Sequence, residues 1–276
     1  MMKKFLKRRY EKMLKKNLGK VEWQSEFETL FALSIEGMNY GRYGRGDFLS
    51  INGEGYGLSY AKSKFPQNTN FVLFDGGANI GEYTKTLVNI FGDSNYTIHS
   101  FEPSKKTYEI LYNNLSDSKY SEGIILNNFG LSNEKSTQTL YSNKEASGMA
   151  SLFQRNLAYR NIVMDKVEEV PLSTIDIYCS ENNIKQIHFL KLDIEGNELN
   201  ALNGAERMIK ERRIQFIQFE FGGTNIDSRT YFKDFWEKLS SEYNFYRIVE
   251  NGIYPITSYR EIFEIFTTIN FLLELK

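Results

Sequence analysis

Short apolar runs alternate with amphipathic segments along most of the chain, from residue 71 to residue 221. Apolar runs bounded by turn residues are typical of buried strands, and apolar positions three and four residues apart are typical of helices. This alternation predicts an α/β fold with a mostly parallel sheet and helices on both faces. The expected strands are 71–75, 96–102, 124–129, 137–141, 187–193, 214–221, 244–249 and 265–273, and the expected helices are 79–91, 104–117, 173–182, 196–211 and 228–241.

The two ends of the chain depart from this alternation. Near the C-terminus no helix separates the last two expected strands, so they should form an antiparallel pair at the edge of the sheet. Before the first strand, residues 23–38 have a helical pattern, and residues 39–60 alternate glycine with tyrosine and phenylalanine, which predicts short strands and turns. We therefore expect an N-terminal extension over residues 1–69 and one domain over residues 70–276.

The first 20 residues carry a strong positive charge. They contain nine Lys or Arg residues and one acid, Glu11, so their net charge is +8, and the rest of the chain carries −9. Such a basic amphipathic helix either packs its apolar stripe on the domain or attaches peripherally to an anionic membrane or an acidic partner. A homodimer contact through this helix or through the edge strands also fits. The apolar residues at helical spacing are Met2, Phe5, Leu6, Tyr10, Met13, Leu14 and Leu18.

The composition indicates the cellular compartment in which the protein works. The single cysteine, Cys179, excludes an internal disulfide framework and favours a reducing compartment. The sequence has neither an apolar run of about 18 residues nor the apolar core of a secretory signal. We expect a cytoplasmic protein that is at most peripheral at the inner face of a membrane.

The candidate chemistry begins where the first expected strand ends. Asp75 precedes a glycine-rich turn that contains Gly76, Gly77 and Gly81, and the next strand ends in Glu102. Glycines at such a turn let the backbone approach a ligand, and the second acid can accept hydrogen bonds from ribose hydroxyls. The G-x-G-x-x-G spacing of dinucleotide sites is absent, and Asp75 would repel a pyrophosphate. The pattern therefore favours S-adenosylmethionine, which has ammonium and sulfonium groups and no phosphate.

Several segments resemble the FkbM family of S-adenosylmethionine-dependent methyltransferases. They are FDGGANIGEYT, SFEPS, LNNFGLSNEKSTQTLY, VPLSTID and LKLDIEGNELNALNGA, within residues 70–222. The Lys-x-Asp-x-Glu-Gly pattern from Lys191 to Gly196 makes the resemblance more specific than the glycine turn alone. It implies a class I, Rossmann-like fold whose mostly parallel seven-stranded sheet has an antiparallel edge. Members are typically O-methyltransferases, so the resemblance also implies a carbohydrate or glycoconjugate acceptor of the surface-polysaccharide or lipopolysaccharide type.

The resemblance also assigns cofactor contacts by motif. The glycine turn would surround the methionine part and the ribose, Glu102 would hold the ribose hydroxyls, and the end of the third strand would reach the adenine. The residues that it implies are Asp75, Gly76, Gly77, Ala78, Asn79, Gly81, Glu102, Pro103, Ser104, Asn128, Phe129 and Gly130.

Methyl transfer to a hydroxyl requires a group that accepts the acceptor proton. The two histidines, His99 and His188, lie mid-strand among apolar neighbours, so we expect them in the core rather than at the reaction. Lys191, Asp193 and Glu195 alternate and would share one face of a strand. Asp193 is the first candidate as general base or metal ligand, and Lys191 could pair with a carboxylate or orient the acceptor.

Two glutamates complete the catalytic candidates. Glu195 could join the reaction or cap the helix that follows it. Glu220 ends an aromatic strand and could meet Asp193 around a substrate hydroxyl or a divalent ion such as Mg²⁺ or Mn²⁺. The loop 143–161 is a candidate lid over this site, and residues 39–60 are a candidate second wall.

Two other function classes are weighed against methyl transfer. One is a nicotinamide-dependent oxidoreductase on a similar scaffold, and the other is a non-catalytic glycan-binding protein. The missing dinucleotide spacing disfavours the first, and the intact set of acids disfavours the second. A nucleic-acid substrate is disfavoured because the chain beyond residue 20 is acidic and the basic helix lacks an adjacent aromatic reading surface.

Overall fold

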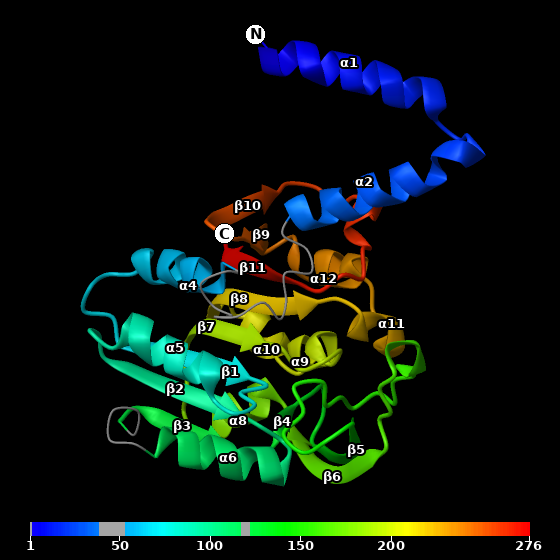
Figure 1. Ribbon diagram of the computed structural model, residues 1–276. Coiled ribbons are helices and arrows are strands. Elements are labelled where there is room, and N and C mark those ends of the chain that lie inside the picture. Colours follow the sequence, from blue (N-terminus) through cyan, green and yellow to red (C-terminus); the bar gives the residue numbers. More distant parts are fainter. Residues whose placement is uncertain (1, 39–52, 117–121) are drawn as a thin grey trace. The chain divides into compact units, whose positions relative to one another are not determined.

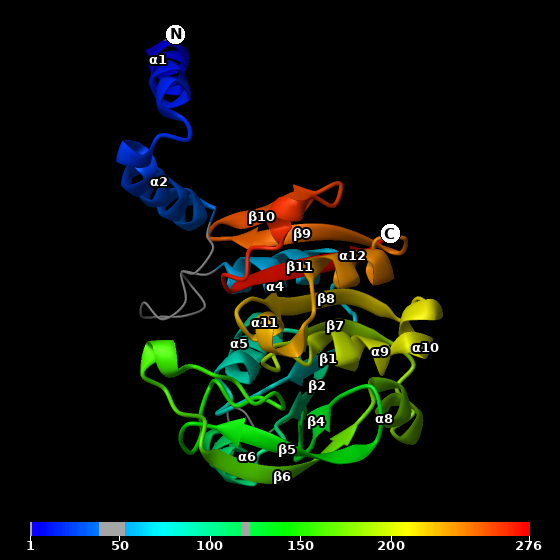
Figure 2. The ribbon, with the colours of Figure 1, turned by 90° about the vertical axis from the view of Figure 1, so that its right-hand side faces the viewer.

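The computed structural model describes residues 2–38, 53–116 and 122–276 (Figures 1 and 2). The chain divides into two compact units, residues 1–42 and residues 43–276. The first contains α1 (Met2–Asn17), the 3₁₀ turn η1 (Val21–Trp23) and α2 (Gln24–Gly37), so both expected N-terminal helices are present. No helix in these described ranges is long and apolar enough to cross a membrane.

The second unit is built on one large sheet. Within the described residues it has eight strands in the order β10-β9-β11-β8-β7-β1-β2-β3. The five strands from β8 to β3 are parallel, and β11, β9 and β10 are antiparallel additions at one edge. The strands are β1 (Phe71–Gly76), β2 (Tyr96–Phe101), β3 (Ile124–Asn127), β7 (Ile187–Leu192), β8 (Ile214–Phe221), β9 (Tyr243–Val249), β10 (Gly252–Ile256) and β11 (Ile269–Leu275).

Helices cover both faces of this sheet. Side chains of α4 and α5 pack with Phe71 and Leu73 of β1 in one core cluster. On the opposite face Phe74 contacts Tyr178 of α8, and Phe219 stacks on Phe235 of α12 with ring centroids 4.4 Å apart. The helices are α4 (Glu54–Ser63), α5 (Glu82–Phe91), α6 (Lys105–Leu115), α8 (Ile175–Glu181), α9 (Glu198–Asn203), α10 (Glu206–Lys210), α11 (Thr224–Ser228) and α12 (Phe232–Leu239), with 3₁₀ turns η2 (Ala158–Arg160) and η3 (Glu261–Phe263).

The α/β fold is thus confirmed, with differences in the strands. The sheet has eight strands where seven were expected, because β9 continues through a tight turn into the edge strand β10. The expected strand at 137–141 exists as β5 (Ser136–Ser142) but lies in a separate sheet with β4 (Gly130–Leu131) and β6 (Lys166–Ser173), in the order β4-β6-β5. The strand β6 was not expected.

The helices differ from the expected ones in three places, one of which is the short helix α11, which was not expected. Residues 54–60, for which short strands and turns were expected, belong to α4, whereas residues 39–52 lie outside the described ranges. The single helix expected at 196–211 is divided into α9 and α10. A Cβ on Gly204 would lie 2.0 Å from the carbonyl oxygen of Ser132, so the backbone at this break is in close contact with the loop after β4.

His99 is buried and His188 is half-buried. His99 Nδ1 is 2.8 Å from the hydroxyl of Tyr178, and burial lowers the pKa of His99 to about 4. His188 Nδ1 accepts a hydrogen bond from the backbone N–H of Val72, and burial lowers its pKa as well. His99 thus contacts α8 and His188 contacts β1, so both imidazoles take part in packing between elements.

Candidate active site

A cavity opens at the carboxyl ends of β1, β2 and β7, where a parallel sheet usually binds its ligand. Its walls come from the glycine turn, the end of β2, β4 and the turn after β7. Part of the expected lid, the loop 143–161, supplies a further wall. The lining residues are Gly77, Asn79, Phe101, Glu102, Pro103, Gly130, Leu131, Leu140, Ser147, Gly148, Ala150, Leu152, Leu172, Asp193, Ile194, Glu195 and Asn197.

Glu102 is fixed in this cavity by the backbone. Its two carboxylate oxygens accept hydrogen bonds from the N–H groups of Asn79 and Ser104, each at 3.0 Å. Burial raises the pKa of Glu102 to about 7, and the two N–H donors act in the opposite direction. Glu102 therefore joins the glycine turn to the start of α6 and presents an oriented acceptor pair.

The glycine turn is shaped by its contact with the neighbouring strand. Gly77 has φ of +78°, and a Cβ at this position would lie 1.9 Å from the carbonyl oxygen of Asp193. A Cβ on Gly76 would lie 3.0 Å from the carbonyl oxygen of Lys191. These glycines thus let the turn after β1 lie directly against the end of β7. Asn79, at φ of +47°, lines the cavity, and its Oδ1 is buried without a hydrogen-bond partner.

Asp75 lies beneath the cavity rather than in its wall. It is fully buried, accepts a hydrogen bond of 2.7 Å from Thr84 Oγ1, and forms an ion pair of 3.2 Å with Lys191 Nζ. Lys191 also donates to the carbonyl oxygen of Gly77 at 3.0 Å and lies 3.7 Å from Asp193. The expected pairing of Lys191 with a carboxylate is confirmed. The charge of Asp75 is balanced by Lys191, so its repulsion of a pyrophosphate is weaker than the sequence suggested.

Lys191 remains charged in this position. Burial alone would lower its pKa, but the carboxylates of Asp75, Asp193 and Glu54 raise it above its ordinary value. Its ammonium also lies 5.0 Å from the ring centroid of Tyr83 on α5. Lys191 thus contacts both the glycine turn and the carboxylate of Asp193.

Several residues expected near the cofactor support the cavity from behind. The side chain of Asn128 donates to the carbonyl oxygens of Glu102 and Pro103, at 2.9 and 3.2 Å. The ring of Phe129 packs on Phe101 and Tyr178. The remaining expected residues absent from the cavity lining are Asp75, Gly76, Ala78, Gly81 and Ser104, whereas Gly77, Asn79, Glu102, Pro103 and Gly130 line it.

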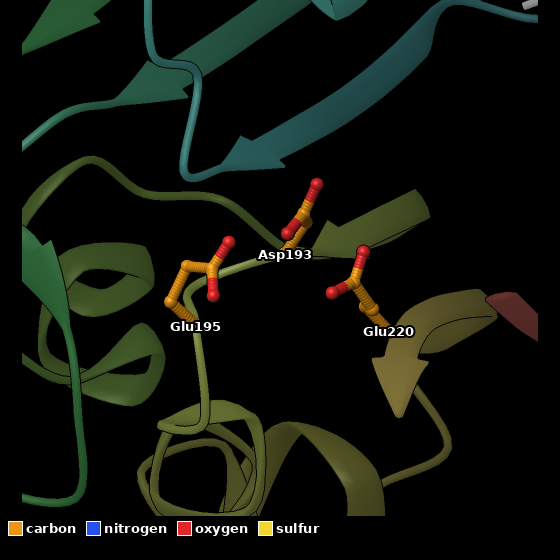
Figure 3. A group of neighbouring side chains, drawn as sticks. All are labelled: Asp193, Glu195 and Glu220. Atoms are coloured by element: carbon orange, nitrogen blue, oxygen red, sulfur yellow. The ribbon is translucent and has the colours of Figure 1, made fainter. Parts of the chain in front are cut away.

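Three carboxylates lie close together, and two of them, Asp193 and Glu195, line the cavity. Oxygen atoms of Asp193, Glu195 and Glu220 all lie within 4.8 Å of one another. Figure 3 shows the three side chains directed into a common space, from the end of β7, the following turn and the end of β8. The strand β7 ends at Leu192, so the expected alternation does not continue to Glu195. Instead a turn with Glu195 at φ of +52° brings its carboxylate to Asp193.

Arg155 of the loop 143–161 is bound to this cluster. Its guanidinium donates to Glu195 Oε2 at 3.2 Å and to Asp227 Oδ2 at 3.0 Å, and the residue is 8% exposed. Ser151 Oγ donates to the carbonyl oxygen of Glu195 at 2.7 Å. Burial and the charge of Asp193 raise the pKa of Glu195, while Arg155 acts against that rise. The loop is therefore attached to the acid cluster by charge and by hydrogen bonds.

The residues that sequence reasoning missed lie in and after this turn. Glu198 is 1% exposed, and its Oε1 accepts from the N–H groups of Ile194 and Gly196, at 2.9 and 3.1 Å. It therefore satisfies the turn amides before α9, a role considered for Glu195. Burial raises the pKa of Glu198 to about 7. Asn197, which lines the cavity, is held by its donation to the carbonyl oxygen of Leu131.

Comparison with known proteins identifies a family and several relatives that this chain resembles. A family model described as the methyltransferase FkbM domain matches residues 75–247. The chain is 26% identical over 160 residues to a protein named Methyltransferase 1 from Beauveria bassiana (strain ARSEF 2860). That match covers 53% of this chain and 62% of the relative. The chain thus spans less than two thirds of the length of this curated relative.

Two solved structures of methylases are similar to part of this chain. The crystal structure of methyltransferase FkbM from Methylobacillus flagellatus KT is 18% identical, with a TM-score of 0.46, over 79% of this chain and 47% of the other. A putative rRNA-methylase from Clostridium thermocellum is 13% identical, with a TM-score of 0.45, over 82% of this chain and 98% of the other.

Proposed function

The chain belongs to the FkbM methyltransferase family, and from this premise we propose that it transfers a methyl group from S-adenosylmethionine to a sugar hydroxyl of a glycan or glycan precursor. The observation that carries the proposal is the position of Glu102 and the acid cluster. An oriented acceptor pair for ribose, on Glu102, and two proton acceptors, Asp193 and Glu195, line one cavity, and Glu220 lies next to these two acids. A ribose site beside a proton acceptor is what methyl transfer to a hydroxyl needs.

The residues of the cavity fit this cofactor. Glu102 is held by two N–H donors so that its oxygens can accept from both ribose hydroxyls. The buried Oδ1 of Asn79 has no hydrogen-bond partner and can accept from the ammonium of the methionine part. Apolar residues of the same lining, such as Leu131 and Leu172, suit the adenine. When bound, the cofactor supplies an electrophilic methyl group on a sulfonium.

Asp193 accepts the acceptor proton in this proposal. It lies at the end of β7, lines the cavity and is partly exposed, so a hydroxyl group can reach it from solvent. Lys191, 3.7 Å away, forms an ion pair with Asp193 and fixes its position relative to the glycine turn. Glu195 and Glu220 complete an acidic rim that accepts hydrogen bonds from neighbouring hydroxyls of the acceptor. A polyol is an acceptor that such a rim can orient.

The same three carboxylates are the ligand type that Mg²⁺ and Mn²⁺ prefer. A divalent ion held by Asp193 and Glu220 would lower the pKa of an acceptor hydroxyl and so replace a general base. Treatment with EDTA followed by dialysis separates the two mechanisms. Undiminished turnover of the treated protein supports Asp193 as the base, whereas loss of turnover that Mg²⁺ or Mn²⁺ restores supports the metal.

The direct test separates cofactor binding from chemistry. Titration calorimetry with S-adenosylhomocysteine should show tight binding that Glu102→Gln weakens at least tenfold, because each lost ribose bond is worth about 1–3 kcal/mol. Asp193→Asn should retain this binding and lose turnover on a sugar acceptor by about two orders of magnitude or more. Failure of the unaltered protein to bind S-adenosylhomocysteine would refute the proposal. Full turnover of Asp193→Asn would refute only the assigned base.

A further inference from the structure

The unit that precedes the methyltransferase domain has a charge pattern of its own. All nine cations of residues 1–20 belong to α1 and the few residues after it, with Glu11 as the only acid there. The acids Glu22, Glu26, Glu28 and Glu36 lie on η1 and α2, and residues 21–38 contain no Lys or Arg. Cationic charge is therefore concentrated on α1. Lys12, Lys15, Lys16 and Lys20 are all exposed.

An apolar groove runs between the two helices of this unit. Tyr10, Met13 and Leu14 of α1 form one wall. The other wall contains Trp23 and Leu30 together with the polar residues Ser25, Glu26 and Thr29. Tyr10 is 45% exposed and Met13 is 43% exposed. At the junction after α1, Leu18 is 62% exposed and Val21 is 86% exposed. Exposed apolar side chains next to a dense group of cations are typical of a binding surface. They fit a partner that offers both apolar groups and negative charge.

We propose that this unit binds the surface of an anionic lipid bilayer. The apolar groove and the junction enter the boundary between headgroups and acyl chains, and the lysines of α1 contact the headgroup phosphates. Tyr10 and Trp23, which combine an apolar ring with a polar atom, suit the depth at which headgroups meet acyl chains. The family model begins at residue 75, so this surface lies outside the matched domain.

The positive charge and the exposed apolar residues together favour a lipid bilayer over a nucleic acid or a second copy of this chain as the partner. A nucleic acid would pair with the lysines but would leave Met13, Leu18 and Val21 in water. A second copy of this chain would bring together two segments that each carry +8. A bilayer that contains acidic lipids satisfies both features, and it needs no change in the methyltransferase domain.

Co-sedimentation with lipid vesicles tests the electrostatic part. The full chain should bind vesicles of phosphatidylglycerol and phosphatidylcholine, bind pure phosphatidylcholine far more weakly, and dissociate as salt is raised. Replacing three exposed lysines of α1, as Lys12→Gln, Lys15→Gln and Lys16→Gln together, should lower the partition about a hundredfold, because each cation near such a surface contributes about 1 kcal/mol. The matched control is Lys135→Gln, Lys185→Gln and Lys210→Gln, which removes the same charge from exposed sites of the other unit and should change binding little.

A second variant tests the apolar part without endangering the fold. Met13→Gln with Leu18→Gln alters only exposed side chains and should lower vesicle binding at least tenfold. All variants should bind S-adenosylhomocysteine as the unaltered protein does, so the outcome is independent of the proposed methyl transfer. Three results would overturn the proposal. They are equal binding of the triple lysine variant and its control, equal binding to neutral and acidic vesicles, and self-association or nucleic-acid binding through the same residues without vesicle binding.

Discussion

Arg155 is the residue whose removal is most informative about the acid cluster. It is the cation that pairs with Glu195, and Arg155→Met would leave Glu195 and Asp227 without it. The pKa of Glu195 is already raised by burial and by Asp193, so we expect a further rise when Arg155 is lost. The acidic limb of the pH–rate profile should shift upward by about one unit, and kcat should fall about tenfold or more. Arg155→Lys should retain part of the activity and shift the pH–rate profile less.

A suitable control lies on the same loop. Arg160 is exposed at the end of η2, so Arg160→Met removes the same charge without touching the cluster. If Arg155→Met loses activity but keeps the pH profile of the unaltered protein, Arg155 only attaches the loop and does not govern the charge of Glu195.

Glu198 gives a prediction about stability and pH. Its ordinary pKa of 4.5 is raised to about 7 by burial, so the folded protein holds this proton more tightly than the unfolded chain does. The resulting stabilisation is complete below pH 4.5 and is lost as the pH rises through 7. We therefore expect Glu198→Gln, which cannot ionise, to be roughly neutral or destabilising at pH 5 and relatively more stable at pH 8, by roughly 1–3 kcal/mol. Urea unfolding at both pH values measures this difference, and a difference that stays constant with pH would contradict it.

The sequence could identify the acids but not all of their partners. Glu102, Asp193 and Glu220 stand at strand ends, and the order of strands in an α/β sheet brings such ends together. The pairing of Asp75 with Lys191 depends on β1 lying directly beside β7, with these two residues in register. The local pattern of apolar and polar residues does not determine the register of β1 against β7. Glu198 could have been recognised as an acid in the first turn of a helix, but the turn amides that it binds depend on the left-handed backbone at Glu195.

At the scale of elements, the contact between the turn after β1 and the end of β7 is predicted to be critical. Gly77→Ala would place a Cβ 1.9 Å from the carbonyl oxygen of Asp193, in a residue with φ of +78°. One of the two backbones must move, so we expect a loss of about 2–4 kcal/mol in the free energy of unfolding. Urea unfolding measures the loss, and titration with S-adenosylhomocysteine measures the effect on the cavity.

Gly223 provides the matched comparison. It has φ of −61°, and the nearest atoms to an added Cβ lie 3.9 Å away, so Gly223→Ala should be tolerated within about 0.5 kcal/mol. Equal stability of the two alanine variants would show that the turn after β1 can shift away from β7 at little cost.

Elements with strong periodicity were predicted well, and elements that depend on tertiary contacts were not. The five parallel strands and α5, α6 and α8 match their expected ranges because each buries a clear apolar face. β6 contains Pro171 and charged residues, and β-ladder contacts with β4 and β5 determine it instead. The glycines of α4 suggested turns, but Leu58 and Ala61 pack into the main core, and this burial outweighs weak helix propensity.

The whole molecule divides its two proposed tasks between its two units. The cavity is lined only by residues between Gly77 and Asn197, and the main core begins with Leu58 of α4. In α2 a single residue, Ile35, is buried. The net charge of the first unit is positive, and the net charge of the second unit, which contains the cavity, is negative. If the two units have these separate tasks, mutations can change membrane binding by the first unit without changing catalysis by the second.

Deletion of residues 1–38 is the prediction that follows for the whole chain. Since the described contacts of the core and cavity lie beyond residue 53, the shortened protein should retain its cooperative unfolding transition. Its free energy of unfolding should change by less than about 1 kcal/mol, and its affinity for S-adenosylhomocysteine should be unchanged within about twofold. Turnover on a soluble sugar acceptor should persist, whereas turnover on an acceptor embedded in acidic vesicles should fall with vesicle binding. Loss of S-adenosylhomocysteine binding on deletion would instead make the N-terminal helices part of the catalytic fold, because the cavity then depends on contacts from α1 or α2.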